Sequence, residues 1–377
     1  MLEPETPPME HFLTCFADLE DPRNDNVRHD LHDILLIALC AVLCGAEDAS
    51  DMALFGRAKE EYFRQFLRLP HGIPSHDTFS RLFRLLNPAQ FHACFLTFMQ
   101  RFAEGLQGVV ALDGKTLRRS FDHASAQSPL HLVSAWGTEQ RLVLGQVAVD
   151  GKSNEITAVP QLLALLSLQD TIVTADAMHC QRAVATQVLA QGGNYVLALK
   201  GNPGTLHEDV RHLLDASPSL PTTTHTTLEK EHGRIETRTS VVLEEIAWVQ
   251  EQHHWPGLAA LGKITRTREI EQQTSTETAY YLLSTPLSAE RFGQVARQHW
   301  GIENSLHWVL DVTMNEDQAR WRKDHGPENL ALLRRWALNV ARLEPSKGSM
   351  KGKRKRAGWN NDYLTQLLAQ FASPHMR

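Results

Sequence analysis

The stretch RQHWGIENSLHWVLD, residues 297–311, carries the acid around which the rest of the chain is organised. The apolar residues in it and just before it recur at helical spacing on one stripe: Val295, Ile302, Leu306 and Val309. His299, Glu303 and His307 lie four residues apart on a neighbouring face. We therefore expect a packed helix that presents one carboxylate and two imidazoles together.

Two apolar runs upstream each end in an aspartate. Residues 109–112 (VVAL) precede Asp113, and residues 172–175 (IVTA) precede Asp176. Such runs are typical of buried strands in a mostly parallel sheet, whose carboxyl ends meet where ligands bind. We expect Asp113, Asp176 and Glu303 to meet there, since three carboxylates suit two divalent cations that bracket a phosphodiester.

Each acid has a purely structural alternative. An Asp-Gly pair such as Asp113-Gly114 is common in turns, and Asp176 has the position of a helix N-cap. Glu303 alone fits an exposed helical position. The combination is more specific, because folding does not require two strand-terminal aspartates and an acid on a half-apolar helix.

The histidines and tryptophans of the same helix have competing interpretations. His299, Glu303 and His307 have the residue types of a zinc site, but zinc there would leave the two aspartates without a task. Orienting Glu303 or contacting phosphate is the favoured role of the imidazoles. Trp300 and Trp308 are expected in the core rather than stacked on bases.

Length and composition restrict the class of protein. A chain of 377 residues is expected to form two or three domains, and 42% apolar with 22% charged residues indicates a globular protein. The formal net charge of -6 argues against a uniformly basic nucleic-acid binder. Any contact with nucleic acid must come from local basic patches.

The five cysteines form an odd set without a CxxC pair, which favours reduced thiols in a cytoplasm. Residues 1–10 are acidic and proline-rich, unlike a secretory signal. The apolar run 34–44 is shorter than the roughly 20 residues that a membrane span needs. We expect a cytoplasmic protein with no membrane partner.

Residues 1–105 are expected to form an N-terminal helical domain with possible DNA contact. Asp33 and Asp51 are the expected caps of helices ending near Gly45 and Phe66. Two further helices are expected over residues 75–86 and 88–102. The segment 73–84 fits the second helix of a helix-turn-helix, with Arg81 and Arg84 on phosphate, or a surface helix that packs Phe79, Leu82 and Phe83 inward.

Strands and helices then alternate through residues 106–217. Strands are expected over residues 109–117, 131–136, 142–149, 171–176 and 195–199, with helices over 155–166 and 181–191. This order predicts an α/β fold: a mixed five-stranded sheet with flanking helices, compatible with a ribonuclease-H-like core. Residues 218–285 are interpreted as a β-rich insertion, and residues 286–344 as the second part of the core with the glutamate helix.

Residues 345–377 form a basic tail with a short last helix. Six basic residues lie within twelve positions: Lys347, Lys351, Lys353, Arg354, Lys355 and Arg356. Such density favours contact with a phosphate backbone, and a solvated linker is the equal alternative.

Taken together, these stretches resemble the DDE transposases of bacterial insertion sequences, in particular the branch that includes the H-repeat-associated proteins. The matching stretches are ALDGKTLRRS (111–120), TADAMHCQ (174–181), YVLALKGNP (195–203), EHGRIETR (231–238), HWGIENSLHWVLDV (299–312), and ED-Q-AR (316–320) followed by PENLALLRR (327–335). They occur in the same order over roughly residues 10–345, so the likeness covers nearly the whole chain.

The resemblance implies a catalytic core in which Asp113, Asp176 and Glu303 bind metal, with Mg²⁺ as the ion and Mn²⁺ as a substitute. The implied substrates are the terminal inverted repeats of a transposon and target DNA. The implied activity is an endonuclease nick at each element end, followed by strand transfer in DNA recombination. A homodimer on DNA is expected because two ends must be joined, in a bacterial, nucleoid-associated protein. Further residues in the matched stretches are expected to contact DNA: Lys115, Arg118, Arg119, Lys200, Arg234 and His299.

The chain departs from the wider superfamily around the last acid. Where relatives have a tyrosine, an arginine and a lysine, it has Ala296, His299 and Leu310. This argues against a hairpin intermediate, and His299 would replace the arginine only when protonated. Two other functions stay open, a DNA-binding remnant without mobility and a nuclease of the same fold.

Overall fold

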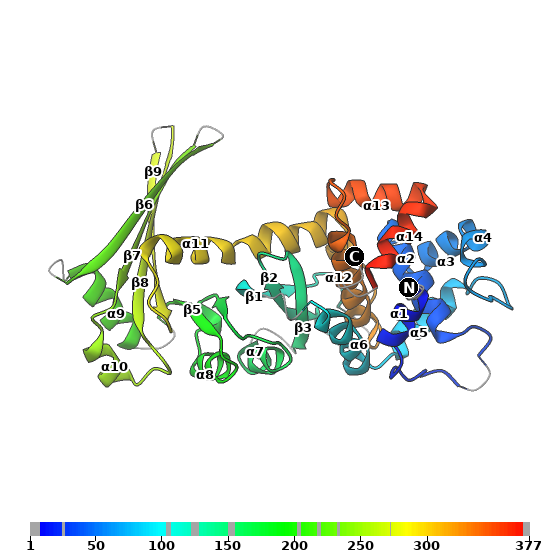
Figure 1. Cartoon of the computed structure of the whole chain (residues 1–377), viewed down its shortest axis with the longest axis horizontal. Coiled ribbons are helices and arrows are strands. Elements are labelled where there is room, and N and C mark those ends of the chain that lie inside the picture. The colour runs from blue at the N-terminus through cyan, green and yellow to red at the C-terminus, as the bar shows by residue number, and fades with distance from the viewer. Residues whose placement is uncertain are drawn as a thin grey trace, which may run out of the picture.

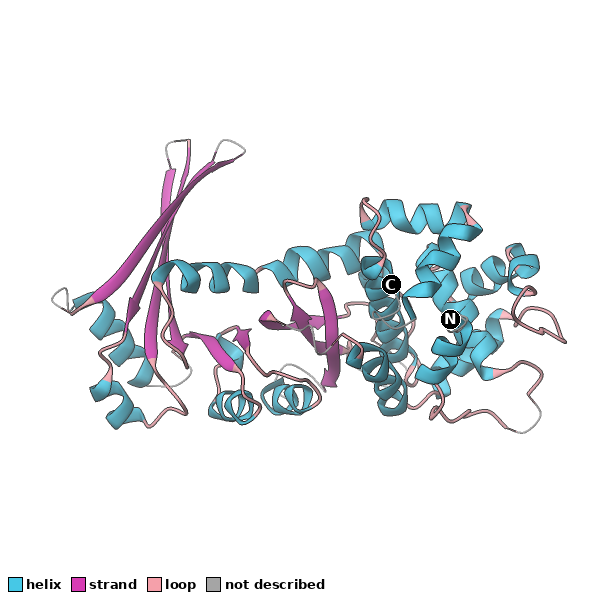
Figure 2. Ribbon diagram, in the orientation of Figure 1, coloured by secondary structure: helices cyan, strands magenta, loops and turns pink. Residues whose placement is uncertain are grey.

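The structure is a computed structural model that describes residues 8–24, 27–102, 107–121, 128–149, 155–201, 205–216, 220–231, 234–271 and 273–371. Helices from the two ends of the chain gather at one end of the molecule, and the strands extend from them toward the other (Figure 2). Among the described helices, none is both long and apolar enough to cross a bilayer.

The N-terminal segment is helical, as predicted. Its helices are α1 (Pro8–Cys15), α2 (Leu31–Cys44), α3 (Ala49–Ala58), α4 (Glu60–Phe63), α5 (His76–Leu85) and α6 (Pro88–Gln100). The predicted caps were wrong by three residues: Asp30 rather than Asp33 caps α2, and Asp48 rather than Asp51 caps α3. In both cases the earlier aspartate accepts the free N–H groups of the first turn. The expected helix 52–66 is also divided at Lys59.

Helix α5, the candidate recognition helix, packs on α3 and α12. Its apolar residues are fully buried, as the surface-helix alternative predicted: Phe79, Leu82 and Phe83. Arg84 Nε donates to Asp324 Oδ2 at 2.7 Å, so this guanidinium is already paired within the protein. Arg81 is exposed, and its contact with phosphate stays a prediction.

The C-terminal helices complete this helical end (Figure 1). They are α12 (Gly326–Leu343), α13 (Met350–Trp359), α14 (Asn361–Leu368) and the short η7 (Ala369–Phe371). Trp336 of α12 is buried and stacks on Phe16, with ring centroids 4.7 Å apart, and Phe371 packs against the same indole. The two ends of the chain therefore share one core.

The basic tail is a folded helix, so its interpretation as a linker was wrong. Lys353 and Arg354 are buried. Lys353 Nζ donates to the carbonyl of Ala341 at 3.0 Å, and an Arg354 Nη donates to the carbonyl of Val42 at 3.1 Å. These two side chains hold α13 against α12 and α2. The other four basic residues are exposed, and their contact with phosphate stays a prediction: Lys347, Lys351, Lys355 and Arg356.

In the described part of the chain, nine strands form one mixed sheet in the order β3-β2-β1-β4-β5-β9-β8-β7-β6. The first five are β1 (Gly108–Thr116), β2 (His131–Gly137), β3 (Leu142–Val149), β4 (Thr171–Ala175) and β5 (Asn194–Leu199). β2 is antiparallel to β1 and β3 is antiparallel to β2, whereas β4 pairs parallel to β1 and β5 parallel to β4. The predicted mixed pairing of these five strands is confirmed. At the edge strand β3, the Asn339 amide of α12 binds both backbone groups of Val143.

The predicted count of five strands was wrong, because the β-rich insertion extends the same sheet. Its strands are β6 (Thr222–Glu231), β7 (Arg234–Leu243), β8 (Ala260–Ile270) and β9 (Gln273–Leu283), and β9 pairs antiparallel with β5. These four strands form a long antiparallel ribbon that projects beyond the body of the molecule (Figure 1). Two helices that the sequence did not predict lie beside it, α9 (Thr205–Ala216) and α10 (Ala247–His253).

Helices cover both faces of the sheet. α7 (Glu155–Ala164) and α8 (Arg182–Ala190) pack on one face, and α11 (Ala289–His299) crosses the other (Figure 1). Val109 lies in the cluster under α11 and Val110 in the cluster on the opposite face, which explains why the run before Asp113 is apolar throughout. Gly262 lets α11 approach, because a Cβ there would lie 2.5 Å from the Phe292 ring.

Candidate active site

The two aspartates lie at the same end of neighbouring strands, as the sequence predicted. Leu112 of β1 is paired with Ala175 of β4 in the parallel ladder, so Asp113 and Asp176 are the next residues on adjacent strands. Asp176 also has its alternative role, because its Oδ1 caps the short η3 helix (Ala177–His179). A carboxylate that caps one side of a turn still has a second oxygen available.

Glu303 follows α11 on a helical segment that continues toward the helical end of the molecule (Figure 1). Its side chain is exposed. Burial raises the pKa of Asp113 to about 7, and the negative charges of Asp176 and Glu303 raise it further. Both acids therefore lie within electrostatic range of Asp113. The structure places Asp113 and Asp176 on adjacent strands, and Glu303 on the segment whose His307 contacts Asp113.

An imidazole lies beside each aspartate. His307 Nδ1 lies 3.4 Å from Asp113 Oδ2, and His179 Nδ1 lies 2.8 Å from Asp176 Oδ1. Burial alone would raise the pKa of Asp176, but the contacts with His179 outweigh it and lower the pKa. No role for His179 was predicted, although it lies in the motif TADAMHCQ, three residues after Asp176.

His299 faces the sheet. Its Nδ1 lies 3.1 Å from Thr174 Oγ1 on β4. Burial lowers its pKa to about 4, and burial lowers the pKa of His307 to about 4 as well. Both rings are neutral at pH 7, so His299 does not carry the positive charge that the arginine of relatives would bring to a phosphate. A neutral phosphate contact by His299 stays a prediction.

The glutamate segment is not a regular α-helix. Two π-helical turns, η4 (Glu303–His307) and η5 (Val309–Thr313), follow α11. A π turn holds one more residue than an α turn, so the buried stripe shifts and Leu310 is fully buried where Val309 was expected. Such turns are frequent at functional sites.

The tryptophans next to Glu303 were wrongly placed in the core. Trp300 is 52% exposed and Trp308 is 56% exposed, and Val312 is exposed as well. Trp300 precedes the first π turn, and both tryptophans lie away from the apolar stripe of Val295, Ile302 and Leu306, so regular helical spacing already directs them to solvent.

The donor set fits a hard divalent cation in its chemistry. Three carboxylates whose charges oppose one another gain from a shared cation, and carboxylate oxygens are the preferred ligands of Mg²⁺. Over the described ranges, however, no group of three or more His, Cys, Asp or Glu side chains could hold a metal ion as arranged. The same finding gives no support to zinc on His299, Glu303 and His307.

The predicted DNA-contacting cations fall into two groups. Arg118, Arg119 and Lys200 are exposed near the ends of β1 and β5, with Arg118 Nε 3.6 Å from Asp317 Oδ2, and their contact with phosphate stays a prediction. Lys115 was wrongly expected on phosphate. It is 8% exposed and its Nζ lies 2.6 Å from Asp311 and 2.8 Å from Asp317, so its charge is used inside the protein.

Arg234 belongs to a row of charges on the ribbon that the sequence did not reveal. One face of β6–β9 carries charges of both signs: Glu229, Arg234, Glu236, Arg238, Arg266, Arg268 and Glu277. Arg268 Nε donates to Glu236 Oε2 at 2.8 Å, and Arg297 of α11 pairs with Glu229. The alternating pattern R-x-E-x-R at 234–238 was the available signal.

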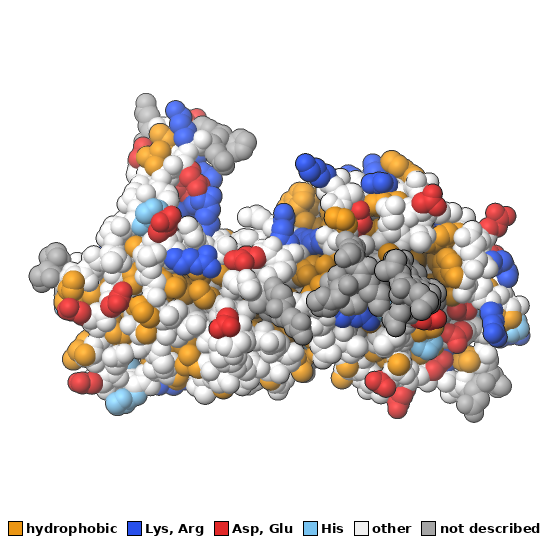
Figure 3. All heavy atoms as spheres, viewed as in Figure 1, with side chains coloured by type: hydrophobic (Ala, Val, Ile, Leu, Met, Phe, Trp, Pro, Cys, Tyr) orange, Lys and Arg blue, Asp and Glu red, His pale blue; other side chains and the backbone are white. Residues whose placement is uncertain are grey.

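Lys and Arg side chains gather beside a hollow in the surface. Figure 3 shows the surface notched between the ribbon and the helical end, with Lys and Arg side chains along both walls. The ridge of Trp300, Glu303 and Trp308 lies on the segment that joins the two walls. Basic side chains thus gather beside the notch, with acidic side chains among them, although the chain as a whole is acidic.

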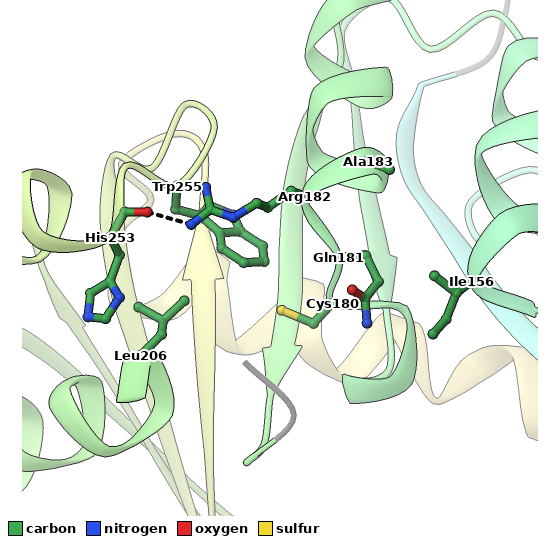
Figure 4. Close-up of a pocket in the computed structure, with 8 residues that line it drawn as sticks. All are labelled: Ile156, Cys180, Gln181, Arg182, Ala183, Leu206, His253 and Trp255. Atoms are coloured by element: carbon green, nitrogen blue, oxygen red, sulfur yellow. Dashed lines mark hydrogen bonds between the residues drawn. The ribbon is translucent and has the colours of Figure 1, made fainter. Parts of the chain in front are cut away.

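A separate cavity of about 320 Å³ lies next to α8 and is lined by residues that include Cys180, Arg182 and Trp255 (Figure 4). Arg182 donates to the carbonyls of His253 and His254 at 2.5 and 2.8 Å and lies over the Trp255 ring. Cys180 and Gln181 lead into it from η3. These contacts fasten α8 to the turn after α10.

Comparison with known proteins gives a consistent result. A family model described as "Transposase DDE domain" matches residues 104–340, and one described as "DDE_Tnp_1-associated" matches residues 13–99. The chain is 37% identical to the "H repeat-associated putative transposase YhhI" of Escherichia coli K12, over 91% of this chain and 93% of that one. It is 46% identical to an "Uncharacterized protein in dhlA 3'region" of Xanthobacter autotrophicus, over 71% of this chain and 92% of that one.

Among solved structures, the piggyBac transposase synaptic complex with hairpin DNA superimposes with a TM-score of 0.43 at 13% identity. It covers 98% of this chain and 82% of that one.

Proposed function

The chain belongs to the DDE transposase family, and from this we propose that it is a metal-dependent transposase that cuts DNA at transposon ends and joins those ends to target DNA. The observation that carries the proposal is geometric: Asp113 and Asp176 follow paired residues on adjacent parallel strands, and His307, four residues after Glu303, lies 3.4 Å from Asp113. The core is proposed to be ribonuclease-H-like.

The acids would hold the divalent cation through their carboxylate oxygens. Bound Mg²⁺, or Mn²⁺ in its place, would lower the pKa of water and offset charge on the leaving oxygen. His179 and His307 would fix the orientation of Asp176 and Asp113, because an imidazole that contacts a ligating carboxylate restricts its rotation. The protein itself supplies no covalent nucleophile.

Two displacements at phosphorus would complete the reaction. In the first, water oxygen bonds to the phosphorus at the element end, and the bond from phosphorus to the 3' oxygen of the element breaks. This frees a 3' hydroxyl and leaves a 5' phosphate on the flanking DNA. In the second, that hydroxyl bonds to a target phosphorus, and the 3' oxygen of the target leaves. Each step breaks one phosphodiester bond, and the second replaces it with another, so no external energy source is required.

The basic side chains beside the notch support double-stranded DNA as the partner (Figure 3). Arg118, Arg119, Lys200 and Arg234 are proposed to contact backbone phosphates at its edges, which positions the duplex without reading its sequence. His299 is proposed to contact phosphate only as a neutral hydrogen-bond donor. The duplex would lie over the ridge of Glu303.

Two further parts of the proposal rest on chemistry and symmetry. Two transposon ends must be cut together, which favours a homodimer on DNA. All five cysteines are free thiols, which favours a reducing compartment such as a bacterial cytoplasm. The domain boundaries at residues 105, 217, 285 and 344 are likewise proposed.

The test is cleavage of the DNA that flanks this gene. With Mg²⁺, the protein should nick that DNA, and Asp113→Asn, Asp176→Asn and Glu303→Gln should each reduce the rate by at least about 10³-fold. Glu290→Gln on α11 is the matched control, because Glu290 is exposed and distant from the aspartates. Full activity in any of the three acid variants would refute the role of that acid. Nicking without joined products would identify a nuclease instead.

A further inference from the structure

Lys115 is surrounded by acids rather than by solvent. It lies on β1, and its Nζ is 2.6 Å from Asp311 Oδ1 and 2.8 Å from Asp317 Oδ1. A third carboxylate oxygen, Glu316 Oε2, lies 3.8 Å away. A lysine with this many partners at 8% exposure is a fixed internal contact, not a free cation.

A second cation, Arg335, binds the buried acid Glu316 of this charge group. Glu316 of η6 (Glu316–Gln318) is fully buried and binds Arg335 of α12, with Nη1 to Oε1 at 2.8 Å. Burial alone would raise the pKa of Glu316, but Arg335 and Lys115 outweigh it and keep the acid ionised. Four elements, β1, η5, η6 and α12, therefore meet at one set of paired charges.

This charge group lies on the same elements as the catalytic acids. Asp113 and Lys115 are two residues apart on β1, so both side chains leave the same face of the strand. Asp311 follows His307 by four residues, and His307 contacts Asp113 at 3.4 Å. The π-helical segment is thus tied to β1 at two successive points, His307 to Asp113 and Asp311 to Lys115.

Two ties on one helix fix its rotation as well as its position. A single contact would let the segment turn about its axis, and Glu303 would turn with it. Because η4 and the first residues of η5 lie between Glu303 and Asp311, a change in either turn would displace the Glu303 carboxylate relative to Asp113.

We propose that Lys115 is a positioning residue, whose ammonium ties η5 and η6 to β1 and so sets the separation of the Asp113 and Glu303 carboxylates on which divalent-cation binding depends. This inference rests on the proposed function, because it assigns the acids to a cation. Residues that orient metal ligands without touching the metal typically change metal affinity by about 10–100-fold when replaced.

The test measures Mn²⁺ binding to the DNA-free protein by electron paramagnetic resonance, together with the Tm of the metal-free protein. Lys115→Met should weaken Mn²⁺ binding by about 10–100-fold. Asp311→Asn, at a side chain that is 31% exposed, should fold normally and weaken binding in the same direction. Lys323→Met is the matched control, because Lys323 is exposed and should leave the affinity unchanged.

A triple variant separates positioning from simple charge neutralisation. Lys115→Met with Asp311→Asn and Asp317→Asn removes the lysine and the two acids closest to it, and leaves Glu316 paired with Arg335. Its Tm should return toward that of the wild type while its Mn²⁺ affinity stays low. If the affinity also returns, or if Lys115→Met binds Mn²⁺ as tightly as the wild type, the positioning role is overturned. If the wild type binds no Mn²⁺ at all, the proposed function fails first.

Discussion

His307 Nδ1 lies 3.4 Å from Asp113 Oδ2, and this contact is not an ion pair at neutral pH. Burial lowers the pKa of His307 to about 4, and burial followed by the charges of Asp176 and Glu303 raises the pKa of Asp113 to about 7. The imidazole is therefore neutral, and its contribution is one of orientation. The predictions below separate such orientation from charge.

Replacing His307 tests whether its Nδ1 atom orients Asp113. His307→Asn keeps a polar nitrogen close to the position of Nδ1, whereas His307→Phe keeps the ring and removes the polar atom. We expect His307→Phe to lower Mg²⁺-dependent nicking by about 10–100-fold and His307→Asn to keep most of the activity. Nicking rates at saturating DNA check this. Equal losses in both variants would instead show that the packing of the imidazole matters.

Asp113 should make the stability of the metal-free protein fall as pH rises. Its pKa is about 7 in the folded state and about 3.9 when unfolded, so the folded state retains a proton that the unfolded state releases. The stabilisation is present below about pH 4 and is lost as pH rises through 7. One pKa unit corresponds to about 1.4 kcal/mol, which sets an upper limit of about 4 kcal/mol.

Asp113→Asn removes this cost of ionisation. Urea melts without metal should find the variant more stable than the wild type at pH 8, with the difference vanishing near pH 4. Added Mg²⁺ should stabilise the wild type and not the variant. The free energy of unfolding of Glu290→Gln should change with pH in the same way as that of the wild type. The same behaviour in Asp113→Asn would contradict the raised pKa.

Glu344 should have the opposite pH dependence. Its Oε2 accepts from Ser346 Oγ at 2.6 Å and from Tyr363 Oη at 2.7 Å. Burial alone would raise its pKa, but these hydrogen bonds and Lys353 outweigh it and lower the pKa to about 2. The stabilisation is present above the unfolded value of about 4.3 and is lost as pH falls through 2.

Glu344→Gln should therefore destabilise the protein at pH 7 by on the order of 3 kcal/mol. The melting curves of variant and wild type should converge as the pH approaches 2. Glu47 is no suitable control because Asn315 binds it, whereas Glu61 is exposed and serves as one. A difference that is the same at pH 3 and pH 7 would mean that shape, not charge, holds α13 and α14 in place.

The sequence predicted the parts of the site that depend on local patterns. Asp113 and Asp176 could be placed because apolar runs buried on both faces identify inner parallel strands, and parallel strands end at one edge. Glu303 could be placed on a helix because the apolar spacing holds through Ile302 and Leu306. Each of these patterns spans only a few residues of the chain.

What the sequence could not predict depends on distant partners. The π turns lie on the segment that contacts Asp113 and Lys115, and no local pattern records those contacts. The motif ALDGKTLRRS does not indicate whether Lys115 contacts phosphate or buried acids, because the acids come from residues far along the chain. The pairing of β9 with β5 likewise joins residues far apart in the chain.

The arginines of the ribbon give the sharpest test of the DNA path. Arg266 and Arg268 lie on β8, on the face that α11 approaches, and their nearest acids are Glu277 and Glu236. If a duplex lies in the notch, its phosphates would compete with these acids for the guanidinium groups. Arg266→Gln with Arg268→Gln should weaken binding to duplexes of unrelated sequence by a similar factor.

The salt dependence of binding distinguishes a phosphate contact from a loss of folding. Each lost contact should reduce the slope of log K against log salt by about 0.9, so the double variant should lose nearly 2. Lys263→Gln is the matched control: it lies on the same strand but pairs with Asp215 at 3.1 Å, on the opposite face. An unchanged slope in the double variant, with weaker binding, would place the duplex away from the ribbon. If the wild type, the double variant and Lys263→Gln have the same affinity and the same salt slope, the DNA does not contact the ribbon.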